Sequence, residues 1–286
     1  MKKILLCTDG SAYSQVSYEY AAWLAKRTEI DLEVLYVSDQ RGEKAAQTTD
    51  FSGSIGIDSY QQLLHQLVEI EAAKAKINHE RAKIILQQAE QFFSDRQVHR
   101  VKLTHETGFL VDLFHQLEQD SDLVILGKRG ENADFATEHL GANLERIVRS
   151  SHKPCLVTPR DFKPINRIML ADDGGKSCQK AIEYLSQSQV FQDLELHLIT
   201  VDTGNTDKAR QQLNMSQQKL SQAGYTPIAK MLTGNVEAEM EQYIVANNID
   251  FLIMGAYGHS RIRHLIIGST TAQMLRNSHI PVLLFR

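Results

Sequence analysis

Short apolar runs alternate with amphipathic stretches along the first half of the chain. The apolar runs are mostly uninterrupted and fall at residues 4–7, 32–37, 101–103, 123–126 and 155–157. Apolar positions recur at helical spacing between them, at residues 14–27, 79–93, 109–118 and 142–149. Uninterrupted runs of this length are typical of strands that are buried on both faces. The alternation predicts an α/β fold, with an open parallel sheet and helices on both faces.

The same pattern occurs a second time in the chain. Residues 3–10 match residues 167–174 at an offset of 164, and both segments end in Asp-Gly. Residues 122–127 match residues 250–255 at an offset of 128. Matches in the same order with nearly constant offsets predict a tandem repeat of one domain. We therefore expect two Rossmann-like domains, each with a five-stranded sheet, at residues 1–159 and 165–286.

The first copy is longer than the second. The offset falls from 164 to 126 between the second and third strands, so the first copy contains about 38 additional residues. This insertion, at about residues 40–76, begins with a polar stretch that contains Gly and Ser. It continues into a pattern with apolar positions at Leu63, Leu67, Ile70 and Ile77, which predicts a helix.

The loops after the strands contain the candidate chemistry, because ligands of open parallel sheets bind at the carboxyl ends of the strands. In the second copy the fourth strand runs into a loop with Gly255 and Gly258, and Gly268 followed by three hydroxyl residues opens the last helix. Such a segment is by itself only a helix cap. After a buried strand, however, its glycines and its unpaired N–H groups favour phosphate. Asp173 would lie across the crevice, facing ribose hydroxyls or a metal ion held by phosphates.

The layout resembles the universal stress protein family in its tandem two-domain form. Nucleotide-binding members of that family contain Gly-x2-Gly-x9-Gly-Ser/Thr, and Gly255, Gly258, Gly268 and Ser269 satisfy this spacing. The resemblance implies ATP, or the related ADP or AMP, in the second domain, and allows Mg²⁺ to lie between the phosphates and Asp173. The nucleotide-binding residues that it implies are Ala171, Asp172, Asp173, Val201, Met254, Gly255, Tyr257, Gly258, His259, Gly268, Ser269, Thr270 and Thr271.

The first copy departs from this glycine pattern. Ten residues separate Gly130 from Gly141, and Ala142 and Asn143 occupy the positions where hydroxyl side chains are expected. The intervening loop also contains three acidic residues, which are unfavourable neighbours for a polyphosphate. We therefore expect the first domain to bind nucleotide poorly or not at all. The residues of this degenerate site are Asp9, Val37, Gly127, Gly130 and Gly141.

Composition and charge restrict the location and the partners. The net charge is −4, which gives no electrostatic signal for nucleic acid or an anionic membrane. No apolar run approaches the roughly 20 residues that span a bilayer, and Asp9 interrupts the apolar start too early for a signal peptide. We therefore expect a cytoplasmic protein with no nucleic-acid or membrane partner.

The last strands are expected to be edges of their own sheets, and apolar edges tend to pair. We expect residues 155–158 and 282–285 to pair within one chain, with a homodimer as a further option for the long insertion. Lys128 and Arg129 are interpreted as surface charge, and His105 and Glu106 as local structural residues because the second copy has Met231 and Leu232 there.

Several functions remain open at this point. We find no nucleophile elbow and no phosphate-loop lysine motif, so efficient catalysis is not expected. A nucleotide-binding sensor or regulator is the leading hypothesis. The alternatives are an interaction or structural module that binds no nucleotide, a slow Mg²⁺-dependent ATPase, and capture of a different ligand by the first domain.

Overall fold

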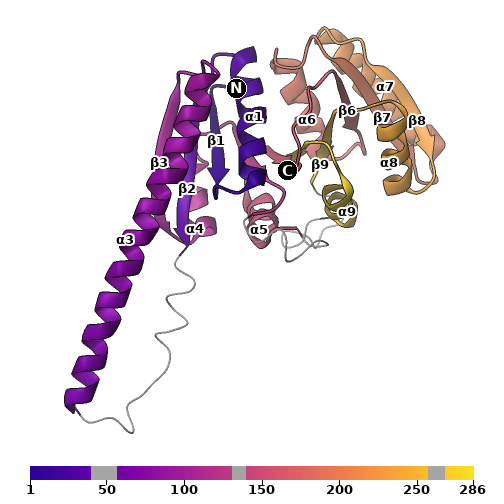
Figure 1. Cartoon of the computed structure of the whole chain (residues 1–286). Coiled ribbons are helices and arrows are strands. Elements are labelled where there is room, and N and C mark those ends of the chain that lie inside the picture. The colour runs from indigo at the N-terminus through magenta and orange to yellow at the C-terminus, as the bar shows by residue number, and fades with distance from the viewer. Residues whose placement is uncertain (40–56, 131–139, 257–267) are drawn as a thin grey trace.

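The two copies of the repeat form the two halves of one sheet in the computed structural model, which describes residues 1–39, 57–130, 140–256 and 268–286. Ten strands of this described part have the order β3-β2-β1-β4-β5-β10-β9-β6-β7-β8 (Figure 1). The first half comprises β1 (Lys3–Thr8), β2 (Asp31–Asp39), β3 (Val101–Gly108), β4 (Leu123–Gly127) and β5 (Cys155–Thr158). The second half comprises β6 (Arg167–Ala171), β7 (Glu195–Asp202), β8 (Ile228–Thr233), β9 (Phe251–Gly255) and β10 (Val282–Phe285).

Neighbouring strands are parallel within each half, as the alternation of strands and helices predicts. The halves meet at β5 and β10, which are antiparallel, with Val282 opposite Val157 and Leu284 opposite Cys155. The expected pairing of the last strands within one chain is therefore present, and it joins the two five-stranded sheets into one. Because this pair is antiparallel, the carboxyl ends of the two sets of strands belong to opposite edges of the sheet.

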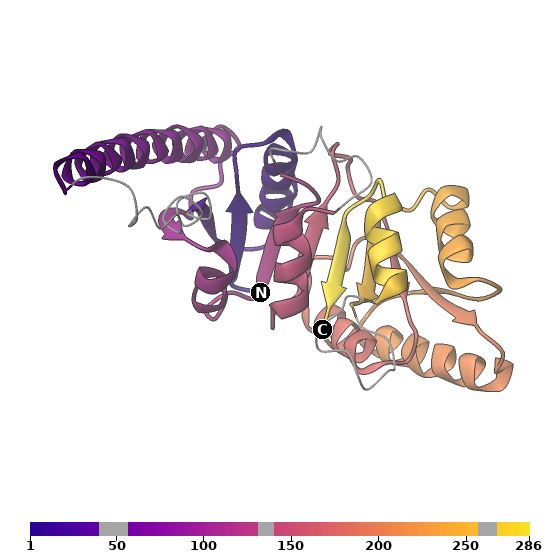
Figure 2. The ribbon, with the colours of Figure 1, turned by 90° about the horizontal axis from the view of Figure 1, so that it is seen from below.

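Helices cover both faces of the sheet (Figures 1 and 2). One face packs against α1 (Ala12–Arg27), α3 (Ile57–Asp95), α6 (Lys176–Gln187) and α7 (Thr206–Gln222). The other face packs against α4 (Leu110–Leu117), α5 (Ala142–Ser150), α8 (Val236–Ala246) and α9 (Ser269–Asn277). Each of the two apolar cores contains side chains from both halves of the chain, so the domains share their cores.

The strand sequences explain this arrangement. In β1, Ile4 and Leu6 enter one core while Leu5 and Cys7 enter the other, and all four side chains are buried. The outermost strands β3 and β8 differ, because most of their residues are partly or fully exposed. Each of these strands lies at an edge of the sheet and has only one neighbouring strand. The prediction that strands are buried on both faces is therefore wrong for these two.

Helix α3 unites the predicted insertion helix with the predicted crossover helix in a single element of 39 residues. Its C-terminal part packs on the sheet through Ala82, Ile85, Leu86, Ala89 and Phe93, which follow helical spacing and are all buried. Residues 65–77 are exposed. This N-terminal part of α3 extends away from the sheet (Figure 1).

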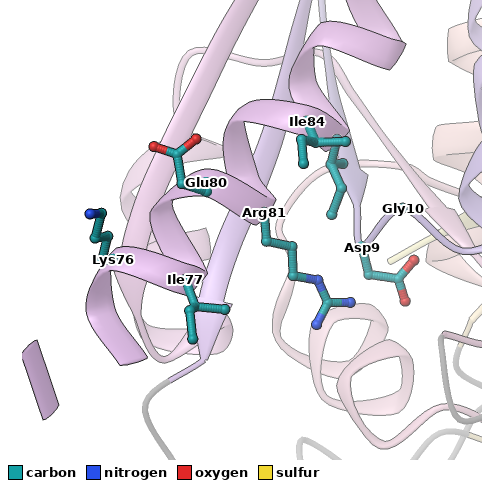
Figure 3. A pocket seen from close by; sticks show the side chains of 8 residues that line it. Asp9, Gly10, Lys76, Ile77, Glu80, Arg81 and Ile84 are labelled. Carbon is teal, nitrogen blue, oxygen red and sulfur yellow. The ribbon is translucent and has the colours of Figure 1, made fainter. Parts of the chain in front are cut away.

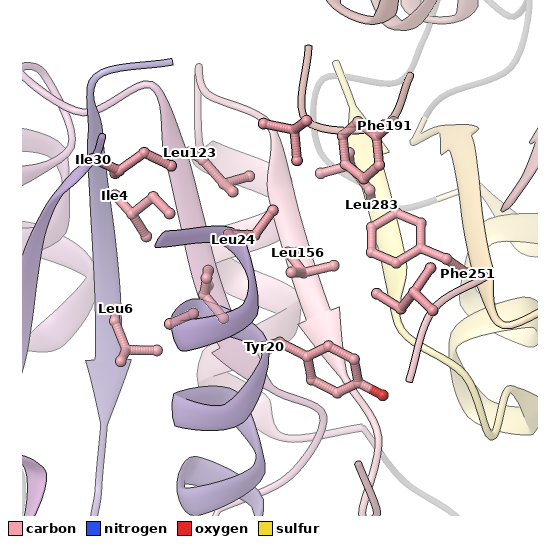
Figure 4. Packing of buried hydrophobic residues seen from close by; sticks show 14 of the residues in the cluster. Ile4, Leu6, Tyr20, Leu24, Ile30, Leu123, Leu156, Phe191, Phe251 and Leu283 are labelled. Atoms are coloured by element: carbon pink, nitrogen blue, oxygen red, sulfur yellow. The ribbon is translucent and has the colours of Figure 1, made fainter. Parts of the chain in front are cut away.

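Aromatic and charged contacts connect α1 to the second domain. The Trp23 ring lies 6.1 Å from the Phe191 ring, which in turn contacts Phe251 at 5.5 Å (Figure 4). Arg27 donates from Nε to the Val190 carbonyl at 2.7 Å and forms an ion pair with Asp193. These contacts attach the first helix of one domain to the core of the other.

Among the described residues, no helix combines the length and apolar character that crossing a membrane requires.

Replacing Phe191 by Ala should lower the free energy of unfolding by about 3–5 kcal/mol, the usual effect of removing a buried aromatic ring. Phe191 is 1% exposed. Urea unfolding can be followed by the fluorescence of Trp23, the single tryptophan of the chain. Its emission should shift to longer wavelength in the folded variant because the ring loses its neighbour. Val245→Ala is the control, since Val245 is 78% exposed and should change stability by less than about 0.5 kcal/mol. Equal effects of both substitutions would contradict this role of Phe191.

Candidate functional site

The carboxyl ends of β6, β7 and β9 lie at one edge of the sheet, and α9 begins next to the end of β9, where the sequence predicts the second-domain crevice. β6 lies between β9 and β7 in the sheet, so its last residue, Ala171, has Met254 and Ile199 as neighbours. Gly255 ends β9, and a Cβ atom there would lie 3.0 Å from the Ser177 Cβ. Close packing therefore requires a glycine at this position.

The two aspartates that follow β6 make different contacts. The Asp172 carboxylate is buried and accepts hydrogen bonds from Ser216 Oγ at 2.6 Å, from Gln212 Nε2 at 3.2 Å and from the Gly174 N–H at 2.9 Å. Its side chain faces α7, so a ligand at the edge of the sheet would contact its backbone. Asp173 is exposed, and its carboxylate reaches solvent at the crevice.

The hydroxyl residues at the start of α9 are also distinct from one another. Gly268 is the N-cap of α9 and provides no side-chain cap. Ser269 is exposed, whereas Thr271 is buried and donates to the carbonyls of Gly255 and Ala256 at 3.3 and 3.2 Å. Thr271 therefore connects α9 to the end of β9, and Ser269 is the hydroxyl that faces solvent at the helix start.

The third hydroxyl, Thr270, contacts an acidic residue. Its Oγ1 donates to Glu237 Oε1 at 2.6 Å. This hydrogen bond lowers the pKa of Glu237, so the carboxylate is ionised at neutral pH. Glu237 therefore places a negative charge beside the N-terminus of α9, where positive helix dipole charge would otherwise attract an anion.

Three expected ligand residues, Tyr257, Gly258 and His259, lie outside the described residues. The described members of the expected set are found around one crevice, at the ends of β6 and β9 and at the start of α9, with Val201 in the neighbouring β7. Their nucleotide contacts stay a prediction.

Three side chains near the end of β6 offer donor atoms that could hold a metal ion. Asp172, Asp173 and Cys178 offer ligand atoms within 4.8 Å of one another. Burial raises the pKa of the Cys178 thiol well above its ordinary value, and the thiol donates to the Ala171 carbonyl at 3.3 Å. Mg²⁺ prefers oxygen ligands, and the Asp172 carboxylate is already fully engaged. The donor set fits Mg²⁺ held by Asp173 and ligand phosphates, not an ion held by all three side chains.

The first-domain aspartate lies against the glycine loop of its own domain. Asp9 Oδ1 accepts hydrogen bonds from Ser14 Oγ at 2.6 Å and from the Ser11 N–H at 2.9 Å. The other carboxylate oxygen lies so close to Gly130 that a Cβ atom there would approach it to 2.6 Å. At the position of Ser14 the second copy has Cys178, whose thiol lies beside Asp173 and donates to the Ala171 carbonyl at 3.3 Å. Asp173 Oδ1 accepts from the Gly175 N–H at 2.8 Å, as Asp9 Oδ1 accepts from the Ser11 N–H.

A groove of about 510 Å³ separates the Asp9-Gly10 loop from α3. Its walls are mainly apolar and include Ile77, Ile84 and Ile85, while Arg81 extends toward Asp9 (Figure 3). At the matching place in the second domain, Gln212 of α7 lies next to Gly174. The glycine after the first strand therefore faces Ile85 in the first domain and Gln212 in the second.

His105 makes local contacts. Its Nε2 lies 2.9 Å from Ser38 Oγ, and its ring contacts the rings of Tyr36 and His79. Burial, together with His79, lowers the pKa of His105. These contacts agree with the local structural role expected from the sequence.

Comparisons with known proteins identify the family. The model of the universal stress protein family matches residues 1–159 and again residues 164–286. The universal stress protein Slr1230 of Synechocystis sp. (strain ATCC 27184 / PCC 6803 / Kazusa) is 50% identical over 287 residues, and the match covers 100% of both proteins. This chain belongs to the universal stress protein family.

Solved structures confirm the fold of this universal stress protein. A universal stress protein from Archaeoglobus fulgidus DSM 4304 is similar with a TM-score of 0.74 and 22% identity, covering 99% of this chain and 98% of that one. A protein of unknown function from Pseudomonas aeruginosa PAO1 has a TM-score of 0.64 and 14% identity, covering 100% of this chain and 92% of the other. The tandem arrangement of two α/β domains is therefore confirmed, and at these identities the likeness concerns the fold alone.

Sequence reasoning missed two charged residues of this universal stress protein. Glu237 occupies the first turn of α8, where an acidic residue is ordinary, and no local pattern indicates its contact with α9. Lys128 was interpreted as surface charge, and this was wrong. It is partly buried, and its Nζ donates to the carbonyls of Arg276 and Ser278, at 3.1 Å for the latter.

Lys128 and Arg286 cap helices reciprocally across the domain boundary. Lys128 follows β4 and binds the C-terminal end of α9, while Arg286 donates to the carbonyls of Ser150 and Ser151 at the end of α5. Burial, together with Arg129, lowers the pKa of Lys128 to about 8, which leaves it mainly charged at neutral pH. A cation at a helix C-terminus is favourable because the last carbonyls carry partial negative charge.

Lys128→Met should lower the free energy of unfolding by about 1–2 kcal/mol, because the carbonyls at the end of α9 lose their cationic donor. Chemical denaturation at neutral pH measures the change. Lys180→Met is the control, since Lys180 is an exposed residue of α6 and its loss should cost less than about 0.5 kcal/mol. If the two variants are equally stable, the contact contributes nothing to domain docking.

Proposed function

We propose that this universal stress protein is a cytoplasmic sensor or regulator that binds ATP, or a related adenine nucleotide, in its second domain. The observation that supports the proposal best is the meeting of β6, β9 and the start of α9, with Gly268 and exposed Ser269 at the helix N-terminus. Orphan N–H groups and the helix dipole favour phosphate there. The complete Gly-x2-Gly-x9-Gly-Ser pattern of the sequence agrees with this position.

The described residues of the proposed site would have different roles. Ala171 and Val201, at the ends of β6 and β7, would border the base and ribose, and Asp173 would accept from ribose hydroxyls or hold Mg²⁺ between its carboxylate and the phosphates. Gly268 and Ser269 would bind phosphate oxygens through backbone N–H groups and a hydroxyl. Asp172 and Thr271 would position the surrounding loops, because their side chains are engaged within the fold.

The first domain would contribute little to nucleotide binding. Asp9 is held by Ser14 and lies against Gly130, so its carboxylate occupies the entrance to the glycine loop. The matching helix start has Ala142 and Asn143 instead of hydroxyl residues. One nucleotide per chain is the expected stoichiometry.

Slow Mg²⁺-dependent hydrolysis is a second candidate function, favoured by the exposed carboxylate of Asp173 beside the proposed phosphate site. Turnover would depend on water activated by the ion. An interaction module that binds no nucleotide is the contrasting hypothesis. Calorimetric titration with ATP and Mg²⁺, followed by measurement of phosphate release, distinguishes these three possibilities.

Gly268→Asp should weaken ATP binding by roughly 100-fold or more, because a carboxylate at the start of α9 repels phosphate and displaces it from the N–H groups. Asp is a favourable N-cap residue, so the helix itself should persist. Gly141→Asp provides a matched control, since Gly141 is the N-cap of α5 in the first domain. Calorimetry should show unchanged affinity for this control. If Gly141→Asp loses ATP binding while Gly268→Asp keeps it, the nucleotide binds in the first domain and the proposal is wrong.

Glu237→Gln should tighten ATP binding roughly 5-fold, because the variant removes a negative charge beside the phosphates while an amide oxygen can still accept from Thr270. Glu241→Gln is the control on the same helix: Glu241 accepts from Asn277 at the far end of α9, at 2.8 Å. Its affinity should match that of the wild type. Unchanged affinity in Glu237→Gln would mean that the phosphates do not lie near the start of α9.

A further inference from the structure

Helix α3 presents an apolar stripe to solvent. Five large apolar side chains of α3 are exposed by 41–66%: Leu67, Val68, Ile70, Ile77 and Ile84. Single exposed apolar residues are common on protein surfaces, but a contiguous set on one element usually indicates an interaction site. Four of the five lie within residues 65–77, in the part of α3 that extends away from the sheet (Figure 1).

The spacing of four of these residues is that of a coiled-coil seam. Ile70, Ile77 and Ile84 are seven residues apart, and Leu67 precedes Ile70 by three. In a heptad, Leu67 takes position a and the three isoleucines take position d, whereas Val68 lies off this seam. Such spacing keeps apolar side chains on one side of a helix over several turns, as a partner helix requires.

The seam positions remain exposed to solvent where α3 packs on the sheet. Position a continues as Lys74, Arg81 and Gln88, and position d continues as Gln91; all four residues are exposed. The buried positions Ile85 and Ala89 lie on a different side of the helix. A second helix could therefore lie along the seam without displacing the contacts that attach α3 to its own domain.

The distribution of charged residues along α3 indicates which partner helix, in which orientation, would be electrostatically favourable. The N-terminal part of the exposed segment contains Glu69 and Glu71 without a Lys or Arg between residues 65 and 73. The C-terminal part contains the basic residues Lys74, Lys76, Arg81 and Lys83, with Glu80 as its acidic residue. A parallel copy would place like charges opposite each other, whereas an antiparallel copy brings the acidic part of each helix to the basic part of the other.

We propose that α3 is a dimerisation helix, which pairs in antiparallel orientation with α3 of a second copy of this chain. The two-fold axis passes between residues 75 and 76, so that Leu67 faces Ile84 of the partner subunit and Lys74 faces Ile77 of the partner subunit. Residues 67–84 then form a paired segment about 27 Å long. Polar residues at Lys74 and Arg81 fix the register at some cost in stability, as polar seam positions do.

This pairing would also cover the first-domain groove. Ile77, Arg81 and Ile84 belong both to the seam and to the wall of the groove beside Asp9 (Figure 3). The partner helix would lie along this wall and place its Leu67 next to Ile84. The partner copy thus completes an apolar surface that one chain leaves open, independently of nucleotide binding in the second domain.

Ile77→Lys should convert the dimer to a monomer in sedimentation velocity measurements over a range of protein concentrations, because it places a second cation opposite Lys74 of the partner subunit on both sides of the two-fold axis. Val68→Lys is the matched control: Val68 is 65% exposed and Ile77 is 66% exposed, on the same helix. Val68→Lys should remain a dimer. A monomeric wild type, or an Ile77→Lys variant that still forms dimers, would overturn the proposal. Unchanged ATP affinity in Ile77→Lys would show that the two proposals stand or fall separately.

Disulfide cross-linking tests the orientation. A chain with both Leu67→Cys and Ile84→Cys should form covalent dimers under mild oxidation, since these positions face each other across the antiparallel pair. Each single variant should not cross-link, and the three native cysteines are buried. Covalent dimers formed by Leu67→Cys alone would indicate parallel pairing and contradict the proposed arrangement. Circular dichroism of every variant checks that the helical content is unchanged.

Discussion

The antiparallel pairing of β5 with β10 is the contact on which the arrangement of the molecule depends. It converts two five-stranded sheets into one ten-stranded sheet, so that each apolar core continues across the domain boundary (Figure 4). An isolated domain would expose the apolar edge formed by its last strand, and pairing satisfies those backbone groups. The same contact brings each crevice next to the amino edge of the other domain, where Lys128 and Arg286 cap the neighbouring helices.

The two copies of the fold differ in the side chains around their matching aspartates. In the first copy, Ser14 donates to Asp9 at 2.6 Å. In the second copy, Cys178 stands at that position, its thiol donates to the Ala171 carbonyl, and Asp173 is exposed. The matching carboxylates therefore have different neighbours, although both follow the first strand of their domain.

The insertion in the first copy has a physical consequence of its own. It lengthens the crossover helix well beyond the sheet, and a long helix without packing is only marginally stable in water. An apolar seam on such a helix favours association, and the groove beside Asp9 lies along that seam. The first domain therefore combines a glycine loop that departs from the family pattern with an exposed apolar seam.

The sequence by itself determined the α/β class, the tandem repeat and the positions of most strands and helices, because apolar periodicity and repeated motifs are local signals. It also placed Asp173, Gly255 and Gly268 at strand ends and a helix start, where the structure has them. Only the tertiary structure decided that Asp172 faces α7, that Glu237 reaches Thr270 and that Lys128 caps a helix of the other domain. These contacts join residues 33 to 150 positions apart, and no local pattern encodes such a distance.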